Sequence, residues 1–313
     1  MKPVKIFIAC LLLLISIQSY TVLAQGCSDA GFCTMGAMRP NQNYLKKTGV
    51  QLRSVELLHY VGYTKFDDII QTTLVDINAN VGQRSIVQLK VPYQTVDGPL
   101  GKTKGMGDIS YSFSYQAYKA SKFQIGATLG GKIPTNNANL KSDRGLALPM
   151  YYQTSLGTYD IVAGLSLVSR KWLFAAGYQH AFNRNGNEFV WAPWNKTADS
   201  ARAAVYPRAN KLKRGDDIML RAERNFRSTK WNAHLGILGI YRLNQDNIVL
   251  KNQEQNFEST IGWAITAVAG VGYHVNTHAT IKLLYGKKII NRDFNPDGLS
   301  REFVTTLSLE WRL

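Results

Sequence analysis

The sequence predicts an all-β protein, a transmembrane antiparallel up-and-down β-barrel of about 12 strands. Three observations support this prediction. The chain begins with a secretory signal, no later stretch is apolar enough for a transmembrane helix, and several segments alternate apolar and polar residues with a period of two. Barrel strands alternate lipid-facing and lumen-facing side chains, so the mean hydropathy of a barrel is unremarkable. The value of −0.17 for this chain therefore fits a membrane protein.

Residues 1–24 have the three parts of a secretory signal peptide. Lys2 and Lys5 supply the positive charge, and the apolar core that follows is shorter than the roughly 20 residues of a spanning helix. Val22-Leu23-Ala24 is typical of a cleavage site, so we expect the mature chain to begin at Gln25. Such a signal indicates export, and together with the predicted barrel it predicts a location in the outer membrane of a Gram-negative cell.

The segment 25–50 precedes the first predicted strand and is expected to be either a periplasmic tail or a plug in the barrel. It contains Cys27 and Cys33, which are disulfide candidates in an oxidising compartment. Acylation of Cys27 is an alternative. Two thiols without a nearby histidine make a poor zinc site, so neither a metal nor a cofactor is expected.

Residues 51–313 are predicted to form the barrel. In 107–117, aromatic and aliphatic residues alternate with Asp108, serines and Gln116. In 259–273, apolar residues alternate with a face of Thr, Gly, Ala and Val. A soluble β-sandwich also alternates, but its polar face meets water and carries many charged residues. These small or hydroxylated faces favour a crowded lumen instead.

The predicted strands are joined alternately by short turns and long loops, as in outer-membrane barrels. The stretch 147–157 offers room for two further strands, which would make about 14. The predicted strands are 51–61, 71–79, 84–94, 107–118, 122–133, 159–169, 172–183, 216–226, 230–242, 259–273, 277–288 and 301–313.

The last strand alternates up to the final residue. Its apolar face ends on Trp311 and Leu313. It resembles the C-terminal signal read by the outer-membrane assembly machinery, although the commonest form of that signal ends on an aromatic residue. The assembly machinery is therefore an expected partner.

The run 84–118 carries a family resemblance. A strand ends in Val91-Pro92-Tyr93, a loop follows, and Gly-Met-Gly-Asp-Ile at 105–109 opens the next strand. This pattern resembles the outer-membrane family labelled meta-pathway phenol degradation proteins, and 156–160 is similar to the middle of that family. The family is related to outer-membrane channels for hydrophobic compounds such as fatty acids. The resemblance therefore implies uptake of small aromatic or apolar solutes.

The formal net charge is +16 for the whole chain and +14 after the loss of Lys2 and Lys5. Nucleic acid is not an expected partner, because the chain is exported and has neither a basic helical stripe nor a nucleic-acid-binding motif. The predicted loop 184–215 is rich in Lys and Arg. We expect this loop to meet the phosphates of lipopolysaccharide, and selectivity for anionic solutes is the alternative.

Strand parity predicts which polar side chains point into the lumen. Two interpretations remain open for them: a wet path for a solute, or paired groups that fill a narrow interior. The lumen-lining candidates are Arg84, Lys90, Asp108, Arg221, Glu223, His234 and Lys282.

No catalytic residues are predicted. Ser166 and His180 lie on neighbouring predicted strands, but parity puts Ser166 inside and His180 outside, so they cannot form a catalytic pair. No Gly-x-Ser-x-Gly motif is present. The predicted function is an outer-membrane channel or transporter for small solutes. The alternative is a non-conducting structural or secretion-associated barrel that docks partner proteins through its outer loops.

Overall fold

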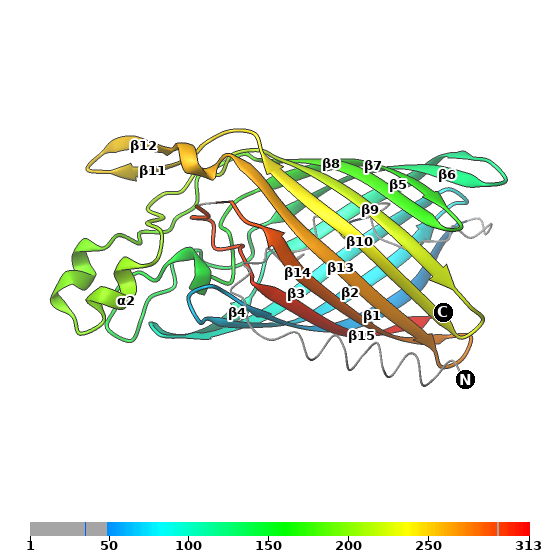
Figure 1. The fold of residues 1–313 in the computed structure, drawn as a ribbon, viewed down its shortest axis with the longest axis horizontal. Helices are drawn as coiled ribbons and strands as arrows, with labels where there is room; N and C mark the ends of the chain where they lie inside the picture. Colours follow the sequence, from blue (N-terminus) through cyan, green and yellow to red (C-terminus); the bar gives the residue numbers. More distant parts are fainter. Residues whose placement is uncertain (1–34, 36–48, 293) are drawn as a thin grey trace.

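The computed structural model describes residue 35, residues 49–292 and residues 294–313. In this part of the chain, 12 antiparallel strands close into a barrel. The strands are inclined to the long axis of the molecule, with helix α2 and the β11–β12 hairpin beyond one end and short turns at the other (Figure 1). Among the described residues, no helix is both long enough and apolar enough to cross a membrane.

The elements follow the chain in a simple order. The barrel strands are β1 (Val50–Tyr63), β2 (Ile69–Val81), β3 (Ser85–Gly98), β5 (Ile109–Lys119), β6 (Phe123–Ile133), β7 (Asp160–Ser169), β8 (Trp172–Ala181), β9 (Asp217–Arg227), β10 (Trp231–Arg242), β13 (Gly262–His274), β14 (Ala279–Ile290) and β15 (Phe303–Arg312). Outside the barrel lie β4 (Gly101–Met106), β11 (Asp246–Leu250), β12 (Gln253–Phe257), helix α2 (Ser200–Ala204) and the 3-10 helices η3 (Met150–Tyr152), η4 (Ala192–Lys196) and η5 (Glu258–Thr260).

Closure depends on the pairing of the first and last barrel strands. β1 is antiparallel to β15, with Ser54 opposite Arg312 and Tyr63 opposite Phe303. Each of the other barrel strands pairs with its neighbours along the chain, except that β4 folds back on the loop end of β3 where the β3–β5 ladder has ended. A closed sheet leaves no open edge in lipid, where unpaired backbone groups cost several kcal/mol each.

The 12 predicted strands match the barrel strands. The sequence did not predict β4 or the β11–β12 hairpin. Both lie beyond the barrel wall, where no lipid face imposes apolar residues on alternate positions. Their sequences, GKTKGM and QEQNF among them, therefore lack the period-two signal.

The alternative of two further strands within 147–157 does not hold, and the prediction of about 12 strands does. This stretch includes η3 and is buried almost throughout. Tyr151 and Tyr152 pack with Phe66, Phe189 and Tyr206 in an apolar cluster formed by the loops. Packing against other loops therefore explains why the stretch 147–157 is rich in apolar residues.

The outer wall is apolar and exposed. On opposite sides of the barrel Phe113, Leu165, Ile237 and Leu307 are each about half exposed. An apolar surface that surrounds the molecule exceeds what a soluble monomer shows, and it fits a lipid-facing band. Aromatic pairs mark both ends of this band, with Tyr63 stacked on Phe303 near the loops and Trp231 beside Tyr273 near the turns.

The predicted division of faces is confirmed. In β5 the serines 110, 112 and 114 are buried, and Tyr111, Phe113 and Tyr115 are exposed. In β13 the inward set includes Ala264, Thr266 and Val268. Side chains with alternate parity therefore meet two different environments, lipid outside and a crowded lumen inside.

Candidate functional site

One side of the lumen is filled by apolar side chains. Val162, Met219, Leu238 and Val268 project from β7, β9, β10 and β13 and are buried together. Met35, from the segment before the barrel, joins this cluster and is 1% exposed. The predicted Cys27–Cys33 disulfide lies outside the described residues and stays a prediction. Apart from Met35, residues 25–48 also lie outside the described part of the chain, so the choice between a periplasmic tail and a plug stays open.

The opposite side of the lumen is hollow. A cavity of about 260 Å³ is lined mainly by inward side chains of β14, β15, β1, β2 and β3, with Arg221 of β9 and His234 of β10 also in its wall. Its lining extends from Met150 and Leu299 among the loops to Arg53 and Arg312 near the turns. One continuous cavity therefore reaches from one end of the barrel towards the other.

The chemistry of this cavity changes along the barrel axis. Most of its apolar residues line its middle and its loop half, where the charged side chains of Asp108, Asp297 and Arg301 also lie, together with polar groups such as Tyr60 and Gln153. These apolar residues are Leu58, Leu74, Pro92, Met150, Leu156, Leu284, Leu299 and Val304. The half near the turns is mainly charged or hydrogen bonding. It includes Arg53, Ser54, Glu56, Asn78, Asn232, His234, Lys282, Ser308, Glu310 and Arg312.

Lys282 is the centre of the charged half. Its Nζ lies 3.1 Å from Oε2 of Glu56 and 2.8 Å from Oε2 of Glu310. Ser308 donates a hydrogen bond of 2.6 Å to Glu56, and Arg312 lies 3.3 Å from Glu310. Two cations and two carboxylates therefore pair around Lys282, and Arg53 adds a third cation to this half of the cavity.

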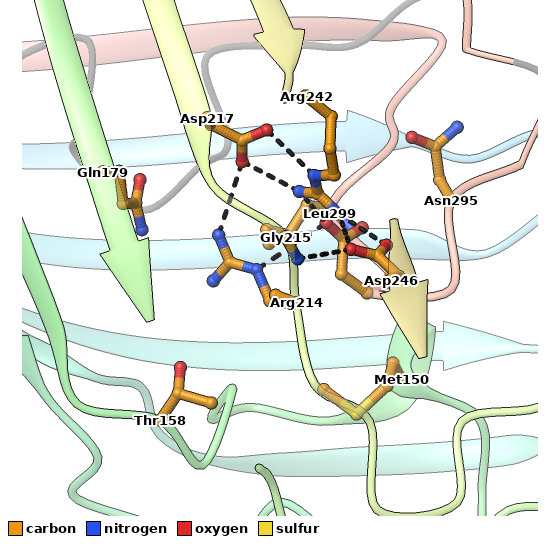
Figure 2. A network of polar contacts seen from close by, with 12 residues as sticks. Met150, Thr158, Gln179, Arg214, Gly215, Asp217, Arg242, Asp246, Asn295 and Leu299 are labelled. Carbon is orange, nitrogen blue, oxygen red and sulfur yellow. Dashed lines mark hydrogen bonds and ion pairs between the residues drawn. The ribbon is translucent and has the colours of Figure 1, made fainter. Parts of the chain in front are cut away.

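A second network closes much of the loop end of the lumen. Figure 2 shows the Arg242 guanidinium between Asp217 and Asp246. Its Nε donates to Asp217 Oδ1 at 2.9 Å, Nη1 to Asp246 Oδ1 at 2.7 Å, and Nη2 to Asp297 Oδ2 at 2.9 Å. Arg214 contributes by contacting Asp217. The network therefore joins the loop ends of β9 and β10 to the loops 243–261 and 291–302.

The arginines of this network keep Asp297, in loop 291–302, ionised. Burial acts to raise the pKa of Asp297, but Arg242, Arg292 and Arg214 hold that pKa well below its ordinary value. Asp68, in the loop after β1, behaves oppositely. Burial raises its pKa even though it accepts a hydrogen bond of 2.7 Å from the Tyr206 hydroxyl.

Loop 134–159 lines the cavity because it is held at the mouth. Asp108 accepts hydrogen bonds from Ser155 Oγ at 2.5 Å and from the Leu156 amide at 2.9 Å. The side chain of Gln153 donates to the carbonyls of Leu140 and Leu148. A residue chosen by parity as a lining group, Asp108, thus also anchors the loop that narrows the entrance.

The structure brings most of the predicted lumen residues together. Lys90, Asp108, Arg221, His234 and Lys282 line the cavity. Glu223 is buried beside them, and it accepts a hydrogen bond of 2.7 Å from Arg221.

Arg84 is the exception and does not line the lumen. It lies in the turn between β2 and β3 and is exposed. The reason is local, because Gly82 adopts a positive φ of 68° in this turn and β3 begins only at Ser85.

His234 differs from its charged neighbours. It is 8% exposed, and neither ring nitrogen has a hydrogen-bond partner among the described residues. The ring lies over Gly270, where an added Cβ would stand 2.1 Å from Cε1. Glycine at this position is what admits the imidazole to the cavity wall.

Ser166 and His180 are placed as parity predicted. Ser166 is buried on the inner face of β7. His180 is partly exposed on β8, and its Nδ1 lies 2.6 Å from Asp216.

Sequence reasoning missed the Arg242 network. Its members come from separate loops and strand ends, so no local spacing joins them. In the sequence, Arg242 is the last residue of a predicted strand and Asp297 lies within a long predicted loop. The one available signal was parity, which makes Arg242 inward like His234.

No protein-family model matches the chain, and no curated protein matches it in sequence. Solved structures do resemble its fold. The COG4313 outer membrane channel from Pseudomonas putida F1 is 12% identical with a TM-score of 0.58, over 88% of this chain and 99% of that one. The NanC porin is 10% identical with a TM-score of 0.47, over 84% and 100%. The CymD monoaromatic hydrocarbon channel is 10% identical with a TM-score of 0.41, over 94% and 95%.

The closed sheet and the exposed apolar band decide where the protein resides. The chain is an outer-membrane β-barrel. By the rule for such barrels, the short turns of this protein face the periplasm and its long loops face outward.

Proposed function

We propose that this barrel is a passive channel for small, largely apolar or aromatic solutes. The observation that carries the proposal is the single cavity lined from Met150 and Leu299 among the outer loops to Arg53 and Arg312 near the periplasmic turns. A lumen packed throughout for stability alone would leave no such continuous space along one wall.

The chemistry of the lining supports the solute class. Leu74, Pro92, Leu156 and Val304 offer an apolar surface in the outer half of the path. A cavity of about 150 Å³ with apolar walls is enough to hold benzene. The 260 Å³ here therefore suits one substituted aromatic ring or an aliphatic molecule of similar size. The family resemblance at 84–118 implies the same class of solute.

A solute-uptake experiment tests the proposal. Purified protein in liposomes should admit small apolar and aromatic solutes faster than sugars of equal size. Thr306 lines the cavity, whereas Leu307 faces lipid and is 56% exposed. Thr306→Trp should therefore block most of the uptake, and Leu307→Trp should not. Equal uptake by both variants, or none by the unmodified protein, would contradict the proposal.

A closed barrel that docks partners is the second candidate function. It is favoured by the Arg242 network, which bridges the mouth, and by the apolar cluster around Met35, which fills one side of the lumen. This candidate predicts no measurable current in a planar bilayer under any solute gradient. A reproducible conductance that Thr306→Trp removes would exclude it.

A further inference from the structure

Four of the five turns at the periplasmic end carry Lys or Arg, and the fifth, 275–278, carries His278. The stretches 82–84, 119–122, 170–171, 227–230 and 275–278 contain no Asp or Glu. Within the described residues, a group of turn cations lies exposed and makes no ion pair with a carboxylate. These are Arg84, Lys119, Lys122, Arg170, Lys171 and Lys230.

The outer loops contrast with this rim. Some of their cations have acidic partners, such as Lys102 with Asp97 at 2.6 Å and Arg184 with Glu254 at 2.5 Å, and these loops also carry Asp and Glu residues that offset much of their positive charge. Arg202 lies 3.3 Å from Asp199. Net positive charge therefore accumulates at the turn end, although loop 184–215 looked the more basic region in the sequence.

The charge is densest across two adjacent hairpins. The turn between β7 and β8 holds Arg170 and Lys171, and the turn between β9 and β10 lies between Arg227 and Lys230. The two are joined by a hydrogen bond of 2.7 Å from the Asn225 amide to the Lys171 carbonyl. Four basic side chains thus share one sector of the rim.

The position of Arg224 indicates that this sector lies at the membrane interface. Parity places it on the outward face of β9, opposite Trp172 of β8, and its guanidinium lies 4.9 Å from the centroid of that ring. An outward arginine is costly at the bilayer midplane but nearly free at the interface. Trp172, Phe226 and Trp231 are exposed at the same level, as aromatic residues at a membrane interface are.

From this arrangement we propose that the rim sector of Arg170, Lys171, Arg224, Arg227 and Lys230 binds the headgroup of an anionic phospholipid in the periplasmic leaflet. Guanidinium and ammonium groups recognise the phosphate, and the neighbouring aromatic side chains pack against the acyl chains. A periplasmic polyanion such as peptidoglycan fits the turn cations but not Arg224, which faces the bilayer. The site is independent of the proposed solute path.

Lipid retention tests the site directly. The full-length mature protein, purified in neutral detergent, is titrated with phosphatidylglycerol or phosphatidylcholine, and bound lipid is counted by native mass spectrometry. Each basic residue near an anionic surface contributes about fivefold in affinity. The triple variant Arg170→Gln, Lys171→Gln, Lys230→Gln should therefore bind phosphatidylglycerol on the order of 100-fold more weakly.

A matched triple variant controls for net charge. Lys104, Lys196 and Lys213 are exposed at the loop end, and their replacement by Gln should leave phosphatidylglycerol binding unchanged. Both triple variants should keep the heat-modifiable migration of the folded barrel. The proposal is overturned if the protein shows no preference for phosphatidylglycerol, or if both variants lose it equally. Displacement by an equal concentration of inorganic phosphate, or binding to isolated peptidoglycan without lipid preference, also overturns it.

Discussion

At the scale of single residues, pairing decides what each buried charge contributes. Arg242 has three carboxylate partners and is fully buried, so it fixes the loops at the mouth. Lys282 also has carboxylate partners, but about 29% of its side chain is exposed to the cavity. Removing one partner of a fully buried pair typically costs about 3–5 kcal/mol, whereas pairs in contact with water contribute about 0–1 kcal/mol. These two residues therefore suit different roles, structural for Arg242 and path-lining for Lys282.

Lys282→Gln tests the path-lining role. The change leaves Glu56 and Glu310 with one cation fewer between them, so the current should shift towards cations in reversal-potential measurements. In a hydrated lumen the free energy of unfolding should fall by no more than about 1 kcal/mol. Lys287→Gln removes the same charge from an exposed position on the same strand and should leave the ion preference unaltered. A fall in stability of about 3–5 kcal/mol with no current would instead indicate a dry, structural ladder.

At the scale of elements, alternation predicted every barrel strand because lipid and lumen act on opposite faces. Strand ends were less predictable. Arg84 falls in a turn that Gly82 makes possible, and the predicted strand at 259 begins at Gly262, after η5. Loop structure was not predictable, since η3, β4 and β11–β12 are stabilised by contacts between loops distant in sequence. The candidate lumen residues were found because parity alone selects them, whereas the Arg242 network required three-dimensional proximity.

The depth of each outward residue determines its tolerance for charge. Ile237 lies at the middle of β10 and is 53% exposed, whereas Ile265 lies near the loop end of β13. Ile237→Arg should lower the free energy of unfolding by about 2–4 kcal/mol, because arginine is most costly at the bilayer midplane. Ile265→Arg should cost about 1 kcal/mol or less, since the penalty declines towards the interface. Denaturant titration in lipid vesicles measures both, and equal costs would contradict the assigned position of the lipid band.

At the scale of the whole molecule, the lumen is divided between an apolar filling and a continuous cavity. The filling includes Met35, so a residue preceding the barrel contributes to its interior. Most of the apolar lining residues lie in the outer half and the middle of the cavity, and the charged cluster around Lys282 lies in the periplasmic half. Under the proposed function, an apolar solute would make most of its contacts in the outer half and would compete with water around Lys282.

Closure of the barrel gives the molecule a collective stability that can be measured on the whole chain. β1 pairs with β15 over ten residue pairs, from Ser54 opposite Arg312 to Tyr63 opposite Phe303. Opening this seam in lipid would leave two strands with unpaired backbone groups, so partial opening is unfavourable and the barrel should unfold as a unit. The mature chain should therefore fractionate with the outer membrane and migrate faster on a detergent gel unheated than boiled.

Tyr60→Pro, which removes a backbone donor within β1, should abolish the fast-migrating form. Ser121→Pro is the control, because Ser121 is exposed in the β5–β6 turn and its amide donates no hydrogen bond among the described residues, so this variant should preserve the fast-migrating form. A mature chain recovered as soluble periplasmic protein would refute the barrel in lipid altogether.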